Sequence, residues 1–509
     1  MKNNIWLIWL AVMWQNLVRN IANKWFKISV FNRTEQVTKD FLEKKYNDNI
    51  NWFYDLKEFV NSLESPRKII LLVKSDAVSS VLNQLKPLLN KEDIVIDCGN
   101  SFFKDTESLI NNVKEFNFLW CWISWWEEGA LNWPSIMPWL PKENKEYIYQ
   151  QISPILTSIA AKDFNWKPCV TLIWNNGAWH FVKMVHNGIE YSIMGVITEV
   201  YKILKNNYKV EHKEIKDIFD NFNKGKLNSY LIEIISEILN KKDEFHKDSY
   251  LIDFILDEAS SKWTWLWTSF SWLELNSDVS SIITSVIERQ VSSDKKLRKK
   301  LSNFYNRNDE KNIYNSVFYY DEWKFKSEFY LNEKESRERF EDLKDFNKFK
   351  LFDNIDKDIY SELESSLYIG IVLSYIQGLN LIIKANETFN WDINLSEVVR
   401  IWQGWCIIRS KFLIKLENIL KEDVTLNNIY LSKVIKKEIE ENIGALKNVI
   451  IKSLLLNQST PILSSSLQSF YSNTSEDSWA NLIQGMRDYF WAHTYKRVDR
   501  EWIFHTNWY

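Results

Sequence analysis

One helical stretch near the middle of the chain carries the residue types best suited to acid–base chemistry. Lys183, Asn187 and Glu190 are spaced i, i+4 and i+7, so they share one helix face, and His186 lies beside them. A lysine and a glutamate on one face suit removal of a hydroxyl proton and return of a proton to carbon. Such a lysine must lose proton affinity, from a pKa of about 10.4 toward 7 to 8, by burial or a cationic neighbour.

An ordinary charge pair on a solvated helix face is the alternative interpretation of this spacing. When no other motif accompanies them, a lysine and a glutamate seven residues apart are most simply explained as such a surface pair. The chemical interpretation therefore depends on the other motifs in the chain.

The N-terminal run 5–14 has the frame of a strand, a phosphate-binding turn and a helix, but tryptophan occupies the positions where the turn needs glycine. The chain has 26 tryptophans and only 11 glycines, and together they reach about 7%, the usual share of glycine alone. Some bacterial lineages read the codon UGA as glycine, whereas a translation table that assigns UGA to tryptophan would write Trp there. We hypothesise that most, but not all, of these tryptophans are glycines in the natural protein.

Read with glycine at positions 9 and 14, the turn becomes a GxAxxG dinucleotide-binding motif with Ala11 at its centre. The glycines permit the tight turn and close helix packing, and the helix N-terminus attracts the pyrophosphate. The predicted cofactor-binding residues here are Trp9, Leu10, Ala11, Val12, Met13 and Trp14.

Asn32, Arg33 and Thr34 follow about 20 residues later, where the ribose 2′ position is normally recognised. An arginine there favours the 2′-phosphate of NADP over NAD through a charge-assisted contact. The alternative is that Arg33 is a solvated loop charge.

The elements that must position these motifs begin with a doubly wound α/β domain of the Rossmann type over residues 1–180. Short apolar runs predict parallel strands, and residues 15–24 the first crossover helix. The predicted strands are 5–10, 27–31, 68–73, 94–97 and 117–123.

Residues 181–458 are predicted to form a large all-α domain. Its amphipathic stretches are 181–205, 361–384 and 395–420, and a charged segment over 293–357 predicts a surface insertion. Residues 459–509 predict an extended C-terminal tail that needs another surface for packing.

Bulk composition argues against several classes of partner. The formal net charge of −3 gives no basic excess for nucleic acid or an anionic membrane, and no uninterrupted apolar run reaches the roughly 18 residues of a membrane span. The four cysteines are scattered without a CxxC pair or metal-ligand spacing, so we expect no metal site and a cytoplasmic location.

The chain resembles the 6-phosphogluconate dehydrogenase family over nearly its whole length. The stretch 183–191, KMVHNGIEY, matches that family's signature closely. Other matches are FNRT at 31–34, Val73-Lys74, DCGNS at 97–101, ISWWEEGA at 123–130, QGMRDYFWAHTY at 484–495 and FHTNW at 504–508. The resemblance implies an NADP-dependent oxidative decarboxylase of the pentose phosphate pathway, which converts 6-phospho-D-gluconate into D-ribulose 5-phosphate and CO2.

The resemblance also implies roles for individual residues. Lys183 would be the general base at the 3-hydroxyl group, and Glu190 would be the acid that protonates C1 of the enediol after CO2 leaves. The domain over 181–458 would bind the substrate and form the dimer. Val73, Lys74 and Asn100 would complete the cofactor site. The implied substrate-binding residues are Asn100, Ser124, Trp125, Trp126, His186, Asn187, Tyr191, Lys262, Arg289, Arg487 and His493. In this family the tail of one subunit completes the other subunit's site, which implies a homodimer.

The tryptophans divide into two groups against the family pattern. Trp267, Trp402 and Trp508 fall on family tryptophans, whereas others fall on family glycines: Trp6, Trp9, Trp14, Trp120, Trp122, Trp125, Trp126, Trp133, Trp139, Trp179, Trp405 and Trp491. Recoding predicts this division. If the letters are literal, the indoles fill the cofactor turn and leave a catalytically inactive dimeric scaffold. A third interpretation is another β-hydroxyacid dehydrogenase that acts on a small unphosphorylated acid.

Overall fold

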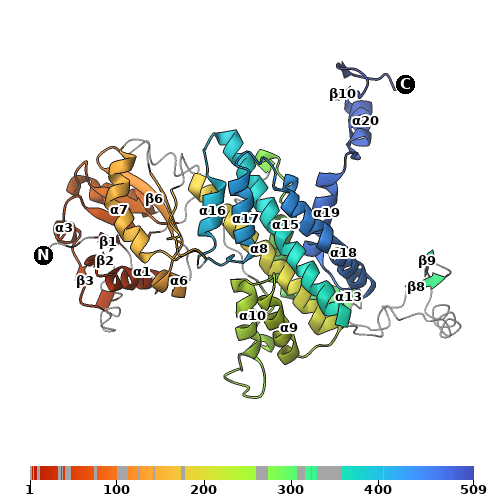
Figure 1. Cartoon of the computed structure of the whole chain (residues 1–509), viewed down its shortest axis with the longest axis horizontal. Helices are drawn as coiled ribbons and strands as arrows, with labels where there is room; N and C mark the ends of the chain where they lie inside the picture. Colours follow the sequence, from red (N-terminus) through yellow and green to blue (C-terminus); the bar gives the residue numbers. More distant parts are fainter. Residues whose placement is uncertain are drawn as a thin grey trace.

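Two bodies make up most of the molecule, an N-terminal α/β domain and a larger helical body, and they lie side by side (Figure 1). The computed structural model describes residues 3, 5–8, 12–32, 36, 38–39, 47–73, 77–99, 113–123, 127–140, 144–172, 178–259, 273–305, 316–321, 324–329, 357–404 and 406–508. This architecture confirms the predicted fold class.

A seven-stranded sheet in the order β3-β2-β1-β4-β5-β6-β7 forms the core of the α/β domain. Its strands are β1 (Ile5–Ile8), β2 (Ile28–Phe31), β3 (Ile50–Phe53), β4 (Lys68–Leu71), β5 (Ile94–Asp97), β6 (Asn117–Ile123) and β7 (Ile136–Trp139). All neighbouring strands pair in parallel except β7, which runs antiparallel to β6. The strand order reverses between β1 and β4, which is where doubly wound sheets bind nucleotides.

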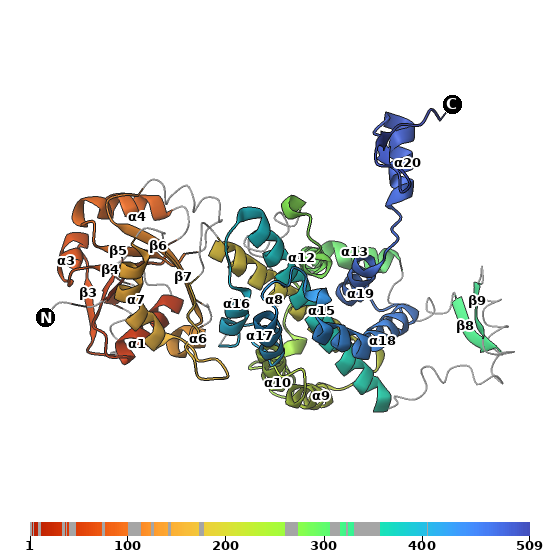
Figure 2. The ribbon, with the colours of Figure 1, turned by 45° about the horizontal axis from the view of Figure 1, so that its top comes forward.

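Helices cover both faces of this sheet. They are α1 (Val12–Asn23), α3 (Leu56–Asn61), α4 (Val78–Leu85), the short η2 (Lys86–Leu88), α6 (Glu127–Asn132) and α7 (Lys145–Ile159). Figure 2 shows α4 and α1 on opposite sides of the strands. The five predicted strands and the first crossover helix are confirmed, although β1 and β4 end two residues earlier than expected. The edge strands β3 and β7 were missed.

The helical body is built around α8 (Ala178–Lys202) and α15 (Lys357–Phe389), which pack against each other. Surrounding them are η3 (Ile203–Asn207), α9 (His212–Lys224), α10 (Tyr230–Asn240), η4 (Leu251–Asp253), α12 (Ser280–Ser293), α13 (Lys295–Phe304), α16 (Leu395–Ile401), α17 (Phe412–Glu422), η6 (Ile429–Leu431), α18 (Lys433–Leu455) and α19 (Pro461–Thr474). By length and apolar composition α15 could cross a membrane, but 89% of its apolar window is buried within the protein. It is the central core helix of this body.

The stretch 395–420 is two helices rather than the single one expected. The chain turns at Trp402–Gly404, where a Cβ on Gly404 would lie 2.4 Å from the sulfur of Cys169. The chain can approach Cys169 of the α/β domain this closely only because it turns at Gly404. The amphipathic pattern of the sequence does not reveal this turn.

The C-terminal region also differs from expectation, because α19 lies within the helical body against α8, α12, α15 and α18. The extended tail therefore begins after Thr474 rather than at residue 459. It contains α20 (Ala480–Trp491) and a small pair of strands, β10 (Tyr495–Lys496) and β11 (Ile503–Phe504), and stands away from the body in Figures 1 and 2. The segment 293–357 includes α13 and a hairpin of β8 (Ser316–Asp321) and β9 (Lys324–Phe329), which also lies apart from the body.

Candidate active site

Helix α8 contacts β6 and β7, and the ring of its His186 lies beside that of Trp122, near the carboxyl end of β6. Nearly every side chain from Ala178 to Ile189 is buried, and Lys183 is only 6% exposed. The alternative of a solvated charge pair is therefore wrong for Lys183. Because charged groups are costly to bury, a lysine in this place is a candidate for a chemical role.

Lys183 lies near the end of β5. Burial lowers the pKa of Lys183 to about 7, while the negative charge of Asp97 acts to raise it. The predicted fall in proton affinity is thus confirmed, and its cause is desolvation. At neutral pH a substantial fraction of the amine is uncharged and can accept a proton.

Asp97, at the end of β5, is close enough to Lys183 for the two charges to act on each other. Its carboxylate accepts hydrogen bonds from the backbone N–H of Gly99 at 2.8 Å and the indole N–H of Trp120 at 3.0 Å. Burial raises the pKa of Asp97 to about 6, although these hydrogen bonds and the charge of Lys183 lower it. Burial also raises the pKa of the adjacent Cys98 thiol, so that group stays neutral.

His186 is enclosed by aromatic rings and a thiol. Its ring lies 5.5 Å from that of Trp122 and 5.7 Å from that of Trp402. Nδ1 is 3.2 Å from Oδ1 of Asn187, and Nε2 contacts the thiol of Cys406. Burial lowers the pKa of His186 to about 4, so the imidazole is neutral and serves as a hydrogen-bonding group.

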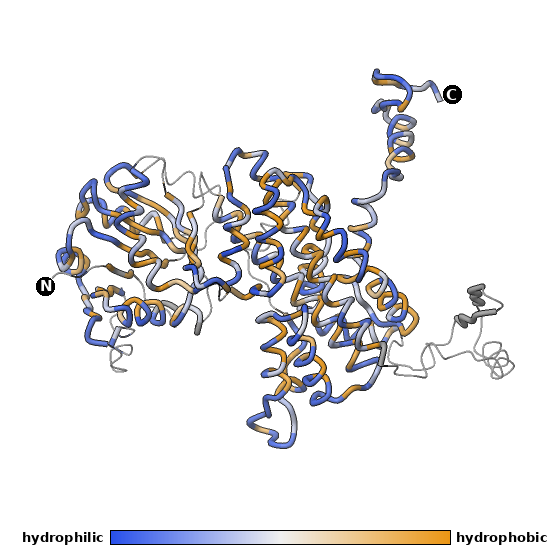
Figure 3. Tube along the Cα trace, in the orientation of Figure 1, coloured by the Kyte–Doolittle hydropathy of each residue, from blue (hydrophilic) through white to orange (hydrophobic). Residues whose placement is uncertain are grey.

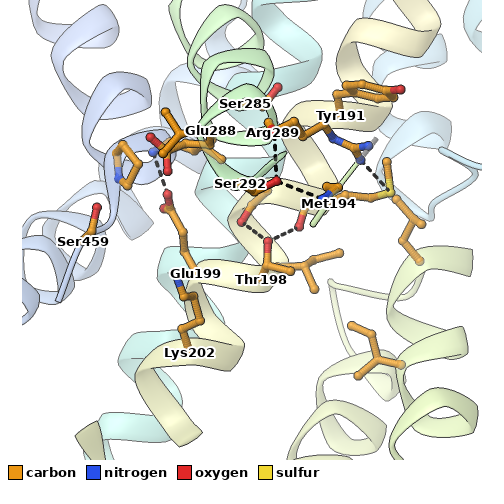
Figure 4. A pocket seen from close by; sticks show the side chains of 18 of the residues that line it. Tyr191, Met194, Thr198, Glu199, Lys202, Ser285, Glu288, Arg289, Ser292 and Ser459 are labelled. Atoms are coloured by element: carbon orange, nitrogen blue, oxygen red, sulfur yellow. Dashed lines mark hydrogen bonds between the residues drawn. The ribbon is translucent and has the colours of Figure 1, made fainter. Parts of the chain in front are cut away.

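Further along α8, Asn187, Glu190 and Tyr191 are half-buried. The guanidinium of Arg289, on α12, stacks over the ring of Tyr191 with its central carbon 3.7 Å from the ring centroid. Both residues border a cavity of about 530 Å³ between α8, α10 and α12 (Figure 4). The structure thus brings Tyr191 of α8 together with Arg289.

The remaining predicted residues divide by position. Asn32 is buried just after β2, and Val73 is buried two residues beyond β4, at the same edge of the sheet. Arg487 and His493 are exposed on the tail, away from α8 of the same chain (Figure 1). Outside the described residues lie Trp9, Leu10, Ala11, Arg33, Thr34, Lys74, Asn100, Ser124, Trp125, Trp126 and Lys262. Val12, Met13 and Trp14 belong to the first turns of α1, but their side chains are not described.

Sequence reasoning missed several groups that define the environment of the site. His180 lies one turn before Lys183, stacks on Trp179 with ring centroids 3.5 Å apart, and has a pKa well below its usual value because it is buried. Asp97 and Cys406 were also missed as neighbours. An acidic residue at the end of a buried strand was the available signal for Asp97, whereas nothing in the sequence connects Cys406 with His186. No group of three or more His, Cys, Asp or Glu suited to a metal ion occurs in the part of the chain that the structure describes.

Comparison with known proteins places these features in a family. Residues 4–174 match the NAD binding domain of 6-phosphogluconate dehydrogenase, and residues 179–508 match the C-terminal domain of the same enzyme. The chain belongs to the 6-phosphogluconate dehydrogenase family.

Individual members of the 6-phosphogluconate dehydrogenase family resemble the whole chain. The decarboxylating 6-phosphogluconate dehydrogenase of Shigella flexneri is 38% identical over 510 residues, covering 100% of this chain and 99% of the relative. The NADP(+)-dependent, decarboxylating enzyme of Bacillus subtilis is also 38% identical, with the same coverage. The structure of Plasmodium falciparum 6-phosphogluconate dehydrogenase, studied with NADP+ and with 6-phosphogluconate, covers 99% of this chain with a TM-score of 0.85 and 35% identity.

Proposed function

We propose that this chain catalyses the NADP-dependent oxidative decarboxylation of 6-phospho-D-gluconate to D-ribulose 5-phosphate and CO2, a step of the pentose phosphate pathway. The observation that carries the proposal is a buried lysine with a pKa of about 7, held at the carboxyl ends of a dinucleotide-binding sheet. Membership of the 6-phosphogluconate dehydrogenase family supplies the substrate and the cofactor.

NADP fits the features of the α/β domain. The sheet reverses its order between β1 and β4, and α1 begins four residues after β1 ends. The residues that would hold the cofactor are those of the turn 9–14, Asn32 to Thr34, Val73, Lys74 and Asn100. When bound, NADP supplies the acceptor for the hydride that leaves C3.

Two side chains of α8 move the protons. Lys183 takes the proton of the 3-hydroxyl group as the C3–H bond breaks, which leaves a 3-keto acid. The C1–C2 bond then breaks, CO2 departs, and the electron pair moves onto the former carbonyl oxygen, where the Lys183 ammonium stabilises its charge. Glu190 donates a proton to the carbon that lost CO2. The neutral His186 and Asn187 orient the substrate by hydrogen bonds.

Substrate phosphate is bound by cations from two chains in this proposal. Arg289 and Tyr191 belong to the same chain as Lys183, and Lys262 would join them. Arg487 and His493 come from the tail of a second copy, which makes the active form a homodimer. The tail supports this arrangement because it exposes large apolar side chains, among them Leu482, Phe490 and Ile503. Figure 3 shows hydrophobic residues along α20 although it stands away from the body.

We also propose that most tryptophans are glycine in the natural protein. Trp25 follows the end of α1 with φ 68°, and Trp166 lies in a turn with φ 63°. These left-handed conformations favour glycine, and both indoles are exposed, at 87% and 83%. Glycine at position 120 would remove the indole that donates to Asp97.

The free cysteines among the described residues agree with a cytoplasmic location.

The first experiment is peptide mass spectrometry on the protein from its native cells, covering residues 5–33, 117–139 and 166. We expect glycine masses at 9, 14, 25, 125, 126 and 166. The gene is then synthesised with the residues found, and NADPH and CO2 formation are measured with 6-phosphogluconate. Tryptophan masses together with no activity would support the inactive scaffold. Activity on an unphosphorylated hydroxy acid alone would support the third interpretation.

A further inference from the structure

A buried carboxylate joins the catalytic helix to the helix that carries the tail. Glu199, near the C-terminal end of α8, is 5% exposed. Its Oε1 accepts the backbone N–H of Ile462 at 2.7 Å, and its Oε2 accepts the N–H of Leu463 at 2.9 Å. These N–H groups belong to the first turn of α19, which begins at Pro461. Figure 4 shows Glu199 pointing from α8 toward this turn.

First-turn N–H groups have no partner within their own helix, and a carboxylate there also interacts favourably with the helix dipole. Glu199 comes from a different helix, so it caps α19 and also fixes α19 on α8. Two glycines shape the same contact. A Cβ on Gly195 of α8 would lie 2.2 Å from Ile462, and a Cβ on Gly370 of α15 would lie 3.0 Å from Leu463.

The charges around Glu199 come from α8, α12 and α13. Burial and Glu288 on α12 raise the pKa of Glu199, whereas the N–H groups of Leu463 and Ile462 and the charge of Lys202 lower it. Because an N–H group points at each of its two oxygens, the side chain is held as the carboxylate. Arg289 and Arg298 border the same cavity. Because both carboxylate oxygens accept N–H groups, a glutamine at 199 would turn its amide NH2 group toward one of them and lose that bond.

Only a short linker separates α19, which ends at Thr474, from α20, which begins at Ala480. The position of α19 therefore sets the point from which the tail leaves the body. We propose that Glu199 is a positioning residue that fixes the origin of the tail, and that it thereby controls binding of the substrate phosphate in the partner subunit's site. This inference rests on the homodimer and the substrate proposed above.

Mixed dimers test the proposal. Two variants are co-expressed with different affinity tags, and dimers that carry both tags are purified. One subunit carries Lys183→Met, which inactivates its own site but leaves its tail intact. The other carries Glu199→Gln, which keeps Lys183 but alters the anchor of its own tail. The single active site of this dimer then receives its tail from the Lys183→Met subunit.

We expect the Glu199→Gln homodimer to bind 6-phosphogluconate with a KM raised about tenfold, the effect of weakening one charge-assisted contact. The mixed dimer should recover the unmodified KM with about half the turnover per dimer, since one of its two sites is inactive. An unchanged KM in the homodimer, or a KM in the mixed dimer that stays raised, would overturn the proposal.

Three controls separate the possible failures. Arg289→Met paired with Lys183→Met should keep its raised KM, because Arg289 acts within its own subunit. Arg487→Met in the same pairing should recover; failure there contradicts the shared site of the proposed function rather than the role of Glu199. Glu288→Gln neutralises a carboxylate of the same cavity that does not cap α19, and should leave KM unchanged. If Glu199→Gln does not yield a folded dimer, Gly195→Ala replaces it, since it displaces Ile462 without changing charge.

Discussion

At the scale of single residues, the site depends on one amine whose pKa is set mainly by burial. Asp97 is close enough to influence Lys183, but burial outweighs it and brings the pKa of Lys183 to about 7. The Asp97 carboxylate also accepts the backbone N–H of Gly99, a bond that does not depend on the residue at position 120. A lysine whose pKa is lowered in this way can accept a proton at neutral pH.

The first prediction concerns the pH dependence of the reaction. The pKa of Lys183 is lowered, so the neutral base is present above about 7 and is lost as pH falls through that value. We expect kcat/KM for 6-phosphogluconate to fall tenfold per pH unit below about 7. Lys183→Met should lower kcat by about 10²–10⁴-fold. Urea unfolding of Lys183→Met is the control, since removing a buried amine should not lower the free energy of unfolding. A kcat/KM that does not change with pH below about 7 would contradict the role of Lys183 as the base.

The second prediction separates substrate binding from chemistry at Arg289. Its guanidinium stacks on Tyr191 and lies away from Lys183 along α8. We expect Arg289→Met to raise KM for 6-phosphogluconate by about 10–100-fold, with kcat changed little, because a charged hydrogen bond contributes about 1.5–3 kcal/mol. Arg298→Met is the matched control, because Arg298 borders the same cavity but pairs with Asp257 at 3.1 Å. A large fall in kcat alone would argue against a binding role for Arg289.

At the scale of elements, the single helix α8 carries Lys183, Tyr191 and Glu199 and fixes their spacing along its length. It presents Lys183 to β5, Tyr191 to α12 and Glu199 to α19, and its opposite side rests on α15. The contact with α15 is close at Gly378, where a Cβ would lie 2.5 Å from Ile189 and 3.1 Å from Val185. Small displacements of α8 at this point would reach the catalytic residues directly.

The third prediction tests this contact with a pair of glycine variants. Gly378→Ala should lower the free energy of unfolding by about 1–3 kcal/mol, because Ile189 must move. It should also lower kcat. Gly444→Ala, inside α18 with no atom within 4 Å of the added Cβ, should raise the free energy of unfolding by up to about 1 kcal/mol and leave kcat unchanged. Urea unfolding and steady-state kinetics measure both, and equal effects of the two variants would contradict the role of the contact.

Elements with a strong local pattern were predictable from sequence, and the others were not. The buried strands β4 and β5 each contain three consecutive apolar residues, as expected of parallel strands covered on both faces. β7 contains Pro138, which argues against a strand in sequence reasoning but is tolerated here at the edge of the sheet. The break between α16 and α17 depends on a contact with Cys169, far away in the chain.

At the scale of the whole molecule, the tail is stabilised internally but not packed on its own body. Asp488, at the end of α20, accepts hydrogen bonds from the N–H groups of Thr494 and Thr506 and from the side chains of His505 and Trp508. Burial acts to raise the pKa of Asp488, but these four bonds outweigh it and hold the pKa at about 2. The tail is therefore held together by its own hydrogen bonds, and it exposes several large apolar side chains that the proposed homodimer would cover.

The fourth prediction is that deleting residues 476–509 separates folding from assembly. The body should keep its helical circular dichroism, because α19 and its anchor at Glu199 remain. The full chain should sediment as a dimer and the shortened chain as a monomer. Activity should fall by about 10²-fold or more, because the groups that position the substrate phosphate are lost. Full activity in the shortened chain would exclude a shared site.

The sequence by itself determined the fold class, the cofactor motif and the cluster on α8, because these depend on residues close together in the chain and on hydrophobic periodicity. The sequence also led to the hypothesis that many positions printed as tryptophan are glycine in the natural protein. Only the tertiary structure decided that Lys183 is buried, that Asp97 and Cys98 lie beside it, and that His186 meets Cys406. The same is true of the bond from Glu199 to α19. Desolvation and long-range contacts arise when distant segments meet, and no local pattern records which segments will do so.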